Sequence, residues 1–181
     1  MIILGVDPGT LFTGYAVIQG VNNRLKLLES GVIKISPKKS LPLRLKQIYD
    51  TLVLVIEKYI PDEFAIETAF YSKNVQSTLK LGHARGVSIL AAVNRQIPIA
   101  EYSPREVKKS IVGTGSASKE QVRYMVCQIM KIKSLPKPLD ISDAIAVAVC
   151  HHNKLLNCST RSRQKWEDFV EQNPKKIINK Y

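Results

Sequence analysis

The first predicted strand of this chain ends on a carboxylate, and this feature limits the folds that the chain can adopt. The apolar run Ile2-Ile3-Leu4-Gly5-Val6 is typical of a strand buried on both faces of a sheet. Asp7 follows directly, and Pro8-Gly9-Thr10 predicts a turn after it. Because an unpaired charge is costly to bury, Asp7 is either a turn residue or a member of a site that neutralises it.

The remaining pattern predicts one α/β domain over residues 1–157. Besides the strand over 1–7, strands are expected over 13–18, 25–35, 63–67 and 97–102. Helices are expected over 41–59, 75–95, 104–112, 117–132 and 139–155. The first three strands form an antiparallel meander, and the later crossovers require parallel pairing. We therefore expect a five-stranded mixed sheet flanked by helices.

Two glycines interrupt the helix expected over 75–95. Gly82 and Gly86 lie about one turn apart, and a glycine inside a helix costs ~1 kcal/mol relative to alanine. They are tolerable there if this helix face presses closely on another backbone.

The charge balance narrows the class of partner. Lys and Arg number 27 against 15 Asp and Glu, a formal net charge of +12, which favours nucleic acid or an anionic membrane surface. No run approaches the ~20 apolar residues of a membrane span, and signal-peptide features are absent. The three scattered cysteines fit reduced thiols in a cytosol. Residues 158–181 are more polar and basic, which predicts a C-terminal extension, either mobile or docked by a short helix.

Four carboxylates occupy positions where apolar residues are expected: Asp7, Glu67, Asp140 and Asp143. Each has an ordinary structural explanation, as a turn residue, an exposed strand end, an N-cap or a first-turn acid. The last two lie three residues apart and share a helix face. At one edge of an α/β sheet, four such groups repel one another unless a cation neutralises them. Oxygen ligands without Cys or His indicate Mg²⁺ or Mn²⁺.

This acidic cluster on a basic chain indicates phosphoryl chemistry on nucleic acid. Two cations about 4 Å apart can serve the attacking water and the leaving oxygen of an in-line displacement. The acids then hold the metals, and the surrounding Lys and Arg attract phosphate.

A series of motifs runs from residue 3 to about residue 150: Leu4-Gly5-Val6-Asp7-Pro8-Gly9-Thr10, Thr13-Gly14-Tyr15, Phe64-Ala65-Ile66-Glu67, Lys73-Asn74, Leu79-Lys80-Leu81-Gly82-His83-Ala84-Arg85-Gly86, Val112-Gly113-x-Gly115-Ser116-Ala117-x-Lys119 and Asp140-x-x-Asp143-Ala144. The ordered set resembles the RuvC family of Holliday-junction resolvases. The resemblance implies a ribonuclease H-like three-layer sandwich. It also implies a homodimeric, Mg²⁺-dependent endonuclease of recombination and repair, with two ions per active site, where Mn²⁺ can substitute. Such an enzyme nicks two strands of like polarity in a four-way junction and works with the RuvA–RuvB branch-migration complex.

The resemblance also assigns roles to individual residues. The family's four metal-ligating acids correspond to Asp7, Glu67, Asp140 and Asp143, and some relatives carry histidine in place of Asp140. Lys108 and Lys119 match basic residues near the scissile phosphate, and Lys119 is expected to be catalytic. Phe70 matches an aromatic that stacks on junction bases. Contacts with the DNA backbone are assigned to Lys73, Asn74 and Arg85. Without the resemblance, Phe70 is an ordinary core residue and Arg85 a structural partner within its helix.

Three alternatives remain at this point. Another ribonuclease H-like nuclease acts on RNA or on other branched DNA, but residues 79–86 and the two lysines favour the resolvase. An actin-like ATPase shares the Asp-x-Gly-Thr opening, but needs two such domains. A junction-binding protein without catalysis does not need the intact set of acids.

Overall fold

The computed structural model describes residues 1–21, 24–68, 75–133 and 140–172, with side chains described as far as residue 157. Five strands form one sheet in the order β3-β2-β1-β4-β5: β1 (Ile2–Asp7), β2 (Phe12–Val21), β3 (Arg24–Lys34), β4 (Glu63–Glu67) and β5 (Ile99–Tyr102). Strands β1, β2 and β3 pair antiparallel, whereas β1 with β4 and β4 with β5 pair parallel. The expected five-stranded mixed sheet is confirmed.

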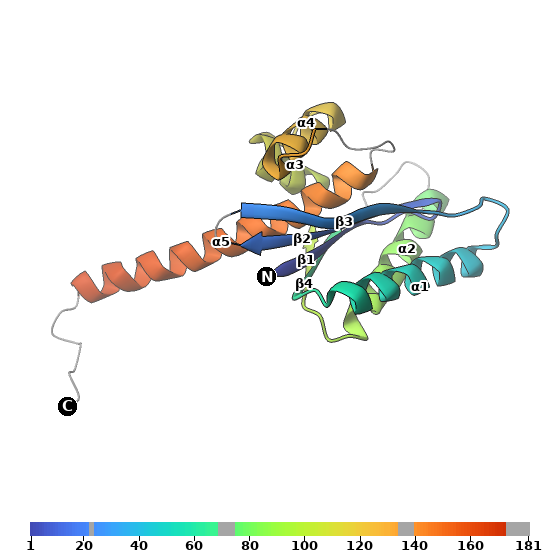
Figure 1. Cartoon of the computed structure of the whole chain (residues 1–181), viewed down its shortest axis with the longest axis horizontal. Helices are drawn as coiled ribbons and strands as arrows, with labels where there is room; N and C mark the ends of the chain where they lie inside the picture. Colours follow the sequence, from blue (N-terminus) through green and yellow to red (C-terminus); the bar gives the residue numbers. More distant parts are fainter. Residues whose placement is uncertain (22–23, 69–74, 134–139, 173–181) are drawn as a thin grey trace.

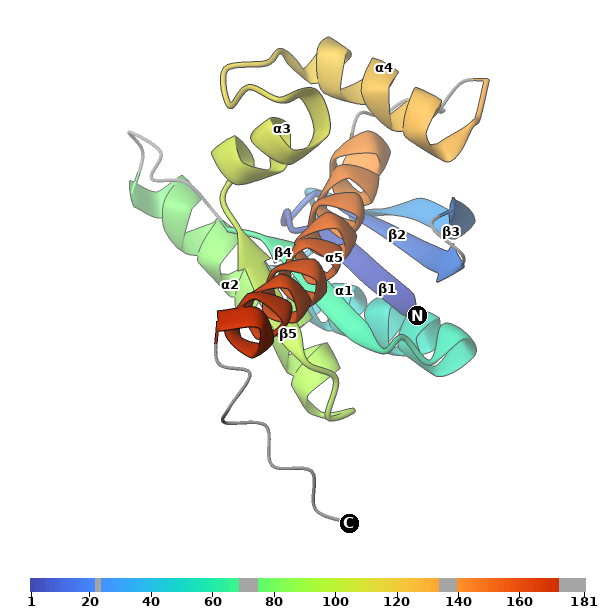
Figure 2. The ribbon, with the colours of Figure 1, turned by 90° about the vertical axis from the view of Figure 1, so that its left-hand side faces the viewer.

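Helices cover both faces of this sheet and give it three layers (Figure 1). Helices α1 (Leu41–Tyr59) and α2 (Val75–Val93) lie on one face. Helices α3 (Pro104–Val112), α4 (Lys119–Met130) and α5 (Asp140–Gln172) lie on the other (Figure 2). Alternate residues of β1 point to opposite faces of the sheet. Ile3 packs in the core beneath α5, and Leu4 packs in the core beneath α1 and α2. The apolar opening run therefore reflects burial on both faces.

Two glycines allow α5 to lie directly on the sheet. A Cβ atom built on Gly14 of β2 would lie 2.1 Å from the backbone oxygen of Asp140. One built on Gly5 of β1 would lie 2.4 Å from the backbone oxygen of Ala144. Both separations are far shorter than a van der Waals contact, so any side chain at these positions would push the helix away from the strands. The close seat brings the first turn of α5 to the end of β1.

Helix α5 is much longer than the segment expected over 139–155, because it continues to Gln172. Residues 156–172 contain neither proline nor glycine, so nothing in the local sequence ends the helix. Their polar composition fits a helix that has passed the edge of the sheet, as Figure 1 shows. None of the helices in the described part of the chain has the length and apolar character needed to cross a bilayer.

The condition stated for Gly82 and Gly86 is not met among the described residues of this chain. Both glycines are exposed, and a Cβ atom added at either one meets nothing within 4 Å among the described residues. No backbone of the described residues therefore accounts for the two glycines.

Candidate catalytic site

Parallel pairing places the first two acids side by side. Val6 of β1 pairs with Ile66 of β4, so Asp7 and Glu67 follow at the same edge, where both strands end. Asp7, Glu67 and Asp143 of α5 line one cleft of about 240 Å³. Lys108 of α3 and Lys119 of α4 line the same cleft. Five of the residues singled out in the sequence therefore lie together, although they come from five elements.

Asp140 lies one turn before Asp143 on α5 but is not among the residues that line the cleft. It is close enough for its negative charge to contribute to the raised pKa of Asp7. Within the described ranges, no three acidic, histidine or cysteine side chains converge closely enough to ligate an ion as they stand. The donor set is nevertheless the right kind for a hard cation, since it consists of carboxylate oxygens.

A lysine supplies positive charge to these acids. The Nζ atom of Lys119 donates a hydrogen bond of 2.7 Å to Oδ2 of Asp143. Burial disfavours the charged ammonium, but the hydrogen bond and the charge of Asp143 outweigh it and raise the pKa of Lys119. Lys119 thus stays protonated and partly offsets the repulsion within the cluster, as a bound cation would.

Burial and mutual repulsion perturb the acids themselves. Desolvation, followed by the charges of Glu67 and Asp143, holds the pKa of Asp7 well above its usual range. Desolvation and the charge of Asp143 raise the pKa of Glu67 to about 7, against the opposing influence of Lys119 and Lys108. Such shifts occur where a fold buries acids and brings like charges together, which is common at functional sites.

Thr13 fixes the loop that follows Asp7, a role that the sequence analysis did not assign. Its buried hydroxyl donates to the backbone oxygen of Gly9 at 2.6 Å and accepts from the Gly9 amide at 3.2 Å. A Cβ atom on Gly9 would lie 2.2 Å from the backbone oxygen of Phe12. The loop is therefore tightly closed. The available signal was a threonine four residues after the glycine, at the start of the next strand.

The remaining predicted DNA contacts have different outcomes. Phe70, Lys73 and Asn74 lie outside the described residues. Arg85 of α2 forms an ion pair with Glu101 of β5, so it has a structural partner, but on a neighbouring strand and not within its own helix as the alternative supposed. Its contact with DNA stays a prediction.

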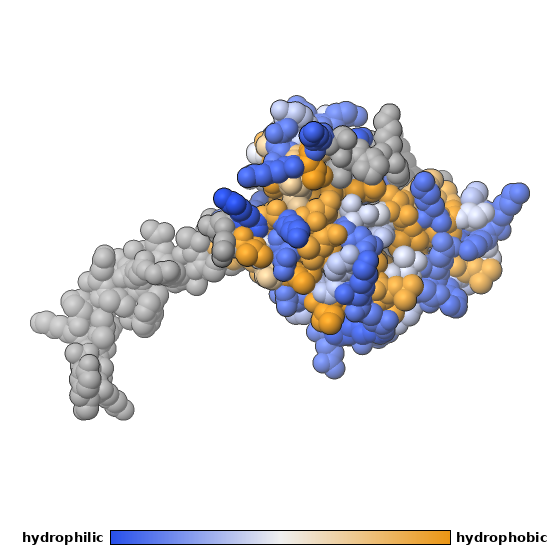
Figure 3. Space-filling model, in the orientation of Figure 1, coloured by the Kyte–Doolittle hydropathy of each residue, from blue (hydrophilic) through white to orange (hydrophobic). Residues whose placement is uncertain are grey.

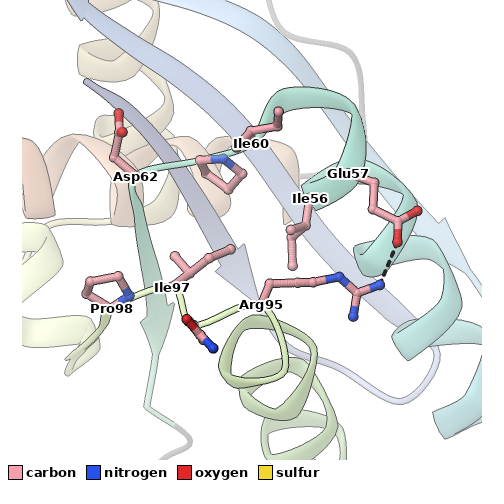
Figure 4. A pocket seen from close by; sticks show the side chains of 9 residues that line it. Ile56, Glu57, Ile60, Asp62, Arg95, Ile97 and Pro98 are labelled. Carbon is pink, nitrogen blue, oxygen red and sulfur yellow. Dashed lines mark hydrogen bonds and ion pairs between the residues drawn. The ribbon is translucent and has the colours of Figure 1, made fainter.

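A second cleft lies where β4 and β5 begin, at the opposite end of these strands from the first cleft. Figure 4 shows side chains that line it. It encloses about 450 Å³ near Asp62 and Pro98, which precede β4 and β5. Its charged pair, Arg95 and Glu57, is joined at 2.5 Å, and much of its wall is isoleucine and proline. The perturbed acids thus belong to the first cleft and not to this one.

Comparison with known proteins places these features in a family. The family model described as "Crossover junction endodeoxyribonuclease RuvC" matches residues 3–151. A protein of that name from Cytophaga hutchinsonii is 46% identical over 97% of this chain and 88% of its own length. One from a Shewanella species is 51% identical over 84% of this chain and 87% of its own length.

Solved structures agree with the sequence matches. Thermus thermophilus RuvC, in complex with a Holliday junction substrate, is 31% identical with a TM-score of 0.79, over 84% of this chain and 93% of that one. A yeast mitochondrial Holliday junction resolvase shares the fold at 15% identity, with a TM-score of 0.58 over 82% of this chain and 77% of its own. With this sheet order, this cleft and a family match over most of its length, the chain belongs to the RuvC family of crossover junction endodeoxyribonucleases.

Proposed function

We propose that this protein is a structure-specific endonuclease that resolves four-way DNA junctions by paired, symmetric, metal-dependent hydrolysis of phosphodiester bonds. The observation that carries the proposal is the single cleft in which Asp7, Glu67 and Asp143 face Lys108 and Lys119. Acids of raised pKa supply ligands for cations, and lysines beside them attract the phosphate. The junction complex of the Thermus thermophilus relative supports the choice of substrate.

The cation proposed for this cleft is Mg²⁺, with Mn²⁺ as a substitute and two ions per site. Asp7, Glu67 and Asp143 would hold it from the cleft, with Asp140 beside them. When bound, such ions activate water and neutralise the charge of the leaving oxygen. Glu67 releases its proton to the solvent as a cation binds, because its pKa of about 7 leaves it partly protonated at neutral pH. Lys108 and Lys119 orient the scissile phosphate by charge.

Two symmetric cuts suit a homodimer with a two-fold axis, and the exposed face of α2 fits the interface. Residues along this face recur at intervals of three and four and are apolar or glycine: Val75, Leu79, Gly82, Gly86, Leu90 and Val93. Val75 is 71% exposed and Leu79 is 59% exposed, which is unfavourable for an unpartnered stripe. The two glycines leave room for a second helix to approach closely. We propose that the α2 helices of two copies meet here.

The cellular setting follows from the same proposal. Cys127 and Cys150 are unpaired, which suits a cytoplasmic enzyme. A resolvase of this family is expected to act on junctions positioned by the RuvA–RuvB branch-migration complex.

One experiment tests the proposed function. The purified protein is incubated with a synthetic four-way junction, a linear duplex of the same sequence and an RNA–DNA hybrid, each with Mg²⁺ or EDTA. Paired nicks at symmetric positions, confined to the junction and dependent on Mg²⁺, are the expected result. Cleavage of the hybrid or of linear DNA would favour another ribonuclease H-like nuclease. Binding without cleavage would favour a non-catalytic junction protein.

A further inference from the structure

Helix α3 separates two clefts. Lys108 faces the catalytic cleft, whereas Arg105 and Lys109 line a second cleft of about 400 Å³. The far wall of this second cleft is the loop 113–115, which joins α3 to α4. Because Lys108 and Lys109 are consecutive, they point about 100° apart around the helix. The second cleft is thus next to the catalytic one on the surface of α3.

The loop holds Arg105 in place. A Cβ atom on Gly115 would lie 2.4 Å from Cγ and 3.2 Å from Nε of Arg105. The aliphatic part of the Arg105 side chain therefore packs against the backbone of Gly115, in space that a side chain at position 115 would occupy. An exposed arginine ordinarily samples many rotamers, and a packed stem reduces the entropy lost when the guanidinium binds a ligand. Arg105 is partly pre-organised at the rim of the cleft.

The one acid of this cleft is already engaged. Oε2 of Glu106 accepts hydrogen bonds from the Ser103 amide at 2.8 Å and from its hydroxyl at 2.7 Å, which completes the capping box of α3. In the described part of the chain, neither Arg105 nor Lys109 is ion-paired to a carboxylate. Two cationic groups four residues apart thus face the opening. Such a surface attracts an anion.

We propose that this cleft binds a backbone phosphate of the DNA strand that is cut, next to the phosphate held in the catalytic cleft. The planar guanidinium of Arg105 matches the two non-bridging oxygens of a phosphodiester, and Lys109 adds a second charge. Among the residues that line this cleft there is no aromatic side chain on which a base could stack. It therefore recognises the backbone and not the sequence. The inference rests on the proposed function, because it requires DNA in the catalytic cleft.

The test is a scan of neutral linkages. Junctions that carry a single methylphosphonate at each position flanking the cut are bound by wild type, by Arg105→Ala and by Lys46→Ala, in Ca²⁺ without cleavage. Wild type should lose affinity about tenfold at one flanking position, the effect expected for one charge-assisted contact. Arg105→Ala should bind the unmodified junction about tenfold more weakly and lose nothing further at that position. Lys46→Ala, on the remote surface of α1, should match wild type.

Two further measurements sharpen the result. Arg105→Ala should make the slope of the logarithm of the binding constant against the logarithm of salt concentration less steep by about 0.9, as expected for one lost phosphate contact. Gly115→Ala should reproduce Arg105→Ala, because it removes the seat of the arginine; if this variant does not fold, the exposed Arg105→Ala variant still decides the question. Unchanged affinity and slope in Arg105→Ala, while wild type binds the junction, overturn this inference alone. Equal losses at every scanned position overturn it too, since they indicate long-range charge. Failure of wild type to bind the junction overturns the proposed function as well.

Discussion

Lys119 and Asp143 are joined by a hydrogen bond of 2.7 Å across the catalytic cleft, from the first residue of α4 to the first turn of α5. The pair connects a cleft lined by three acids to a cation that the protein itself supplies. Lys119 therefore stabilises a cluster of buried acids, and under the proposed function it also places a positive charge beside the scissile phosphate.

Lys119→Met should destabilise the protein when no divalent metal is present. The acids would then repel one another without their resident cation, at a cost of about 1 kcal/mol, a modest value because the lysine side chain is 59% exposed. Thermal unfolding in EDTA at pH 8 should show the loss, and millimolar Mg²⁺ should restore most of it. Lys46→Met, which breaks the surface pair with Asp50, is the matched control. Equal unfolding temperatures for both variants would contradict the role of Lys119.

Mg²⁺ should stabilise the wild-type protein, because the proposed metal site exists in the folded cluster and not in the unfolded chain. At a hundred times its dissociation constant the gain is about 2.7 kcal/mol. Asp7→Asn should lose most of this gain, whereas Asp50→Asn on α1 should keep it. Calorimetric scans with increasing MgCl₂ measure the effect, and a wild-type unfolding temperature that does not change from EDTA to Mg²⁺ would count against the metal site.

Asp7→Asn should separate binding from cleavage. The substitution preserves shape but removes one anionic ligand, so cleavage should fall by a hundredfold or more, as expected for about 3 kcal/mol of lost transition-state stabilisation. Binding to the junction, which depends on Lys and Arg, should persist and weaken steeply with salt. Gel shifts and single-turnover cleavage on the same junction check both. Full cleavage by this variant would remove Asp7 from the catalytic group.

Glu67 should make stability depend on pH in the absence of metal. Its pKa rises from 4.5 in the unfolded chain to about 7 in the fold, so the folded state holds more protons between these values. The contribution of Glu67 to the free energy of unfolding therefore falls as the pH rises from 4.5 to about 7. Glu67→Gln should be more stable than wild type by about 3 kcal/mol at pH 8 in EDTA and nearly equal to it at pH 4. Urea unfolding at both pH values provides the measurement, and a pH-independent difference would contradict the shift.

Leu79→Glu should convert a dimer to a monomer. A charge placed on the exposed stripe of α2 would be desolvated when two copies meet. Leu54→Glu on α1, where the leucine is 66% exposed, should leave the mass in solution unchanged. Light scattering across a concentration series measures the mass. A dimeric Leu79→Glu protein, or a monomeric wild type, would exclude the α2 interface.

Much of the fold follows from local patterns in the sequence. The burial of Leu4 and Val6 on one face and Ile3 on the other explains the continuous apolar run. Ser103 and Ser118 form capping boxes with Glu106 and Gln121, so the start of α3 was predicted correctly and that of α4 to within two residues. The end of α5 was predicted too early. Its apolar residues mark only the part of the helix that packs on the core, and no proline or glycine ends the helix before Gln172.

Local patterns in the sequence were enough to show that acids end two strands and begin a helix, because apolar periodicity and helix capping are local properties. The family resemblance then assigned these acids a common purpose. The distances between them depend on tertiary packing: Gly14 has no side chain to keep α5 away from the sheet at Asp140, Lys119 reaches Asp143 from another helix, and Arg85 is paired with Glu101. Tertiary packing likewise leaves nothing among the described residues against Gly82 and Gly86. These relationships join residues far apart in the chain, and close packing in three dimensions, not local preference, sets which of them meet.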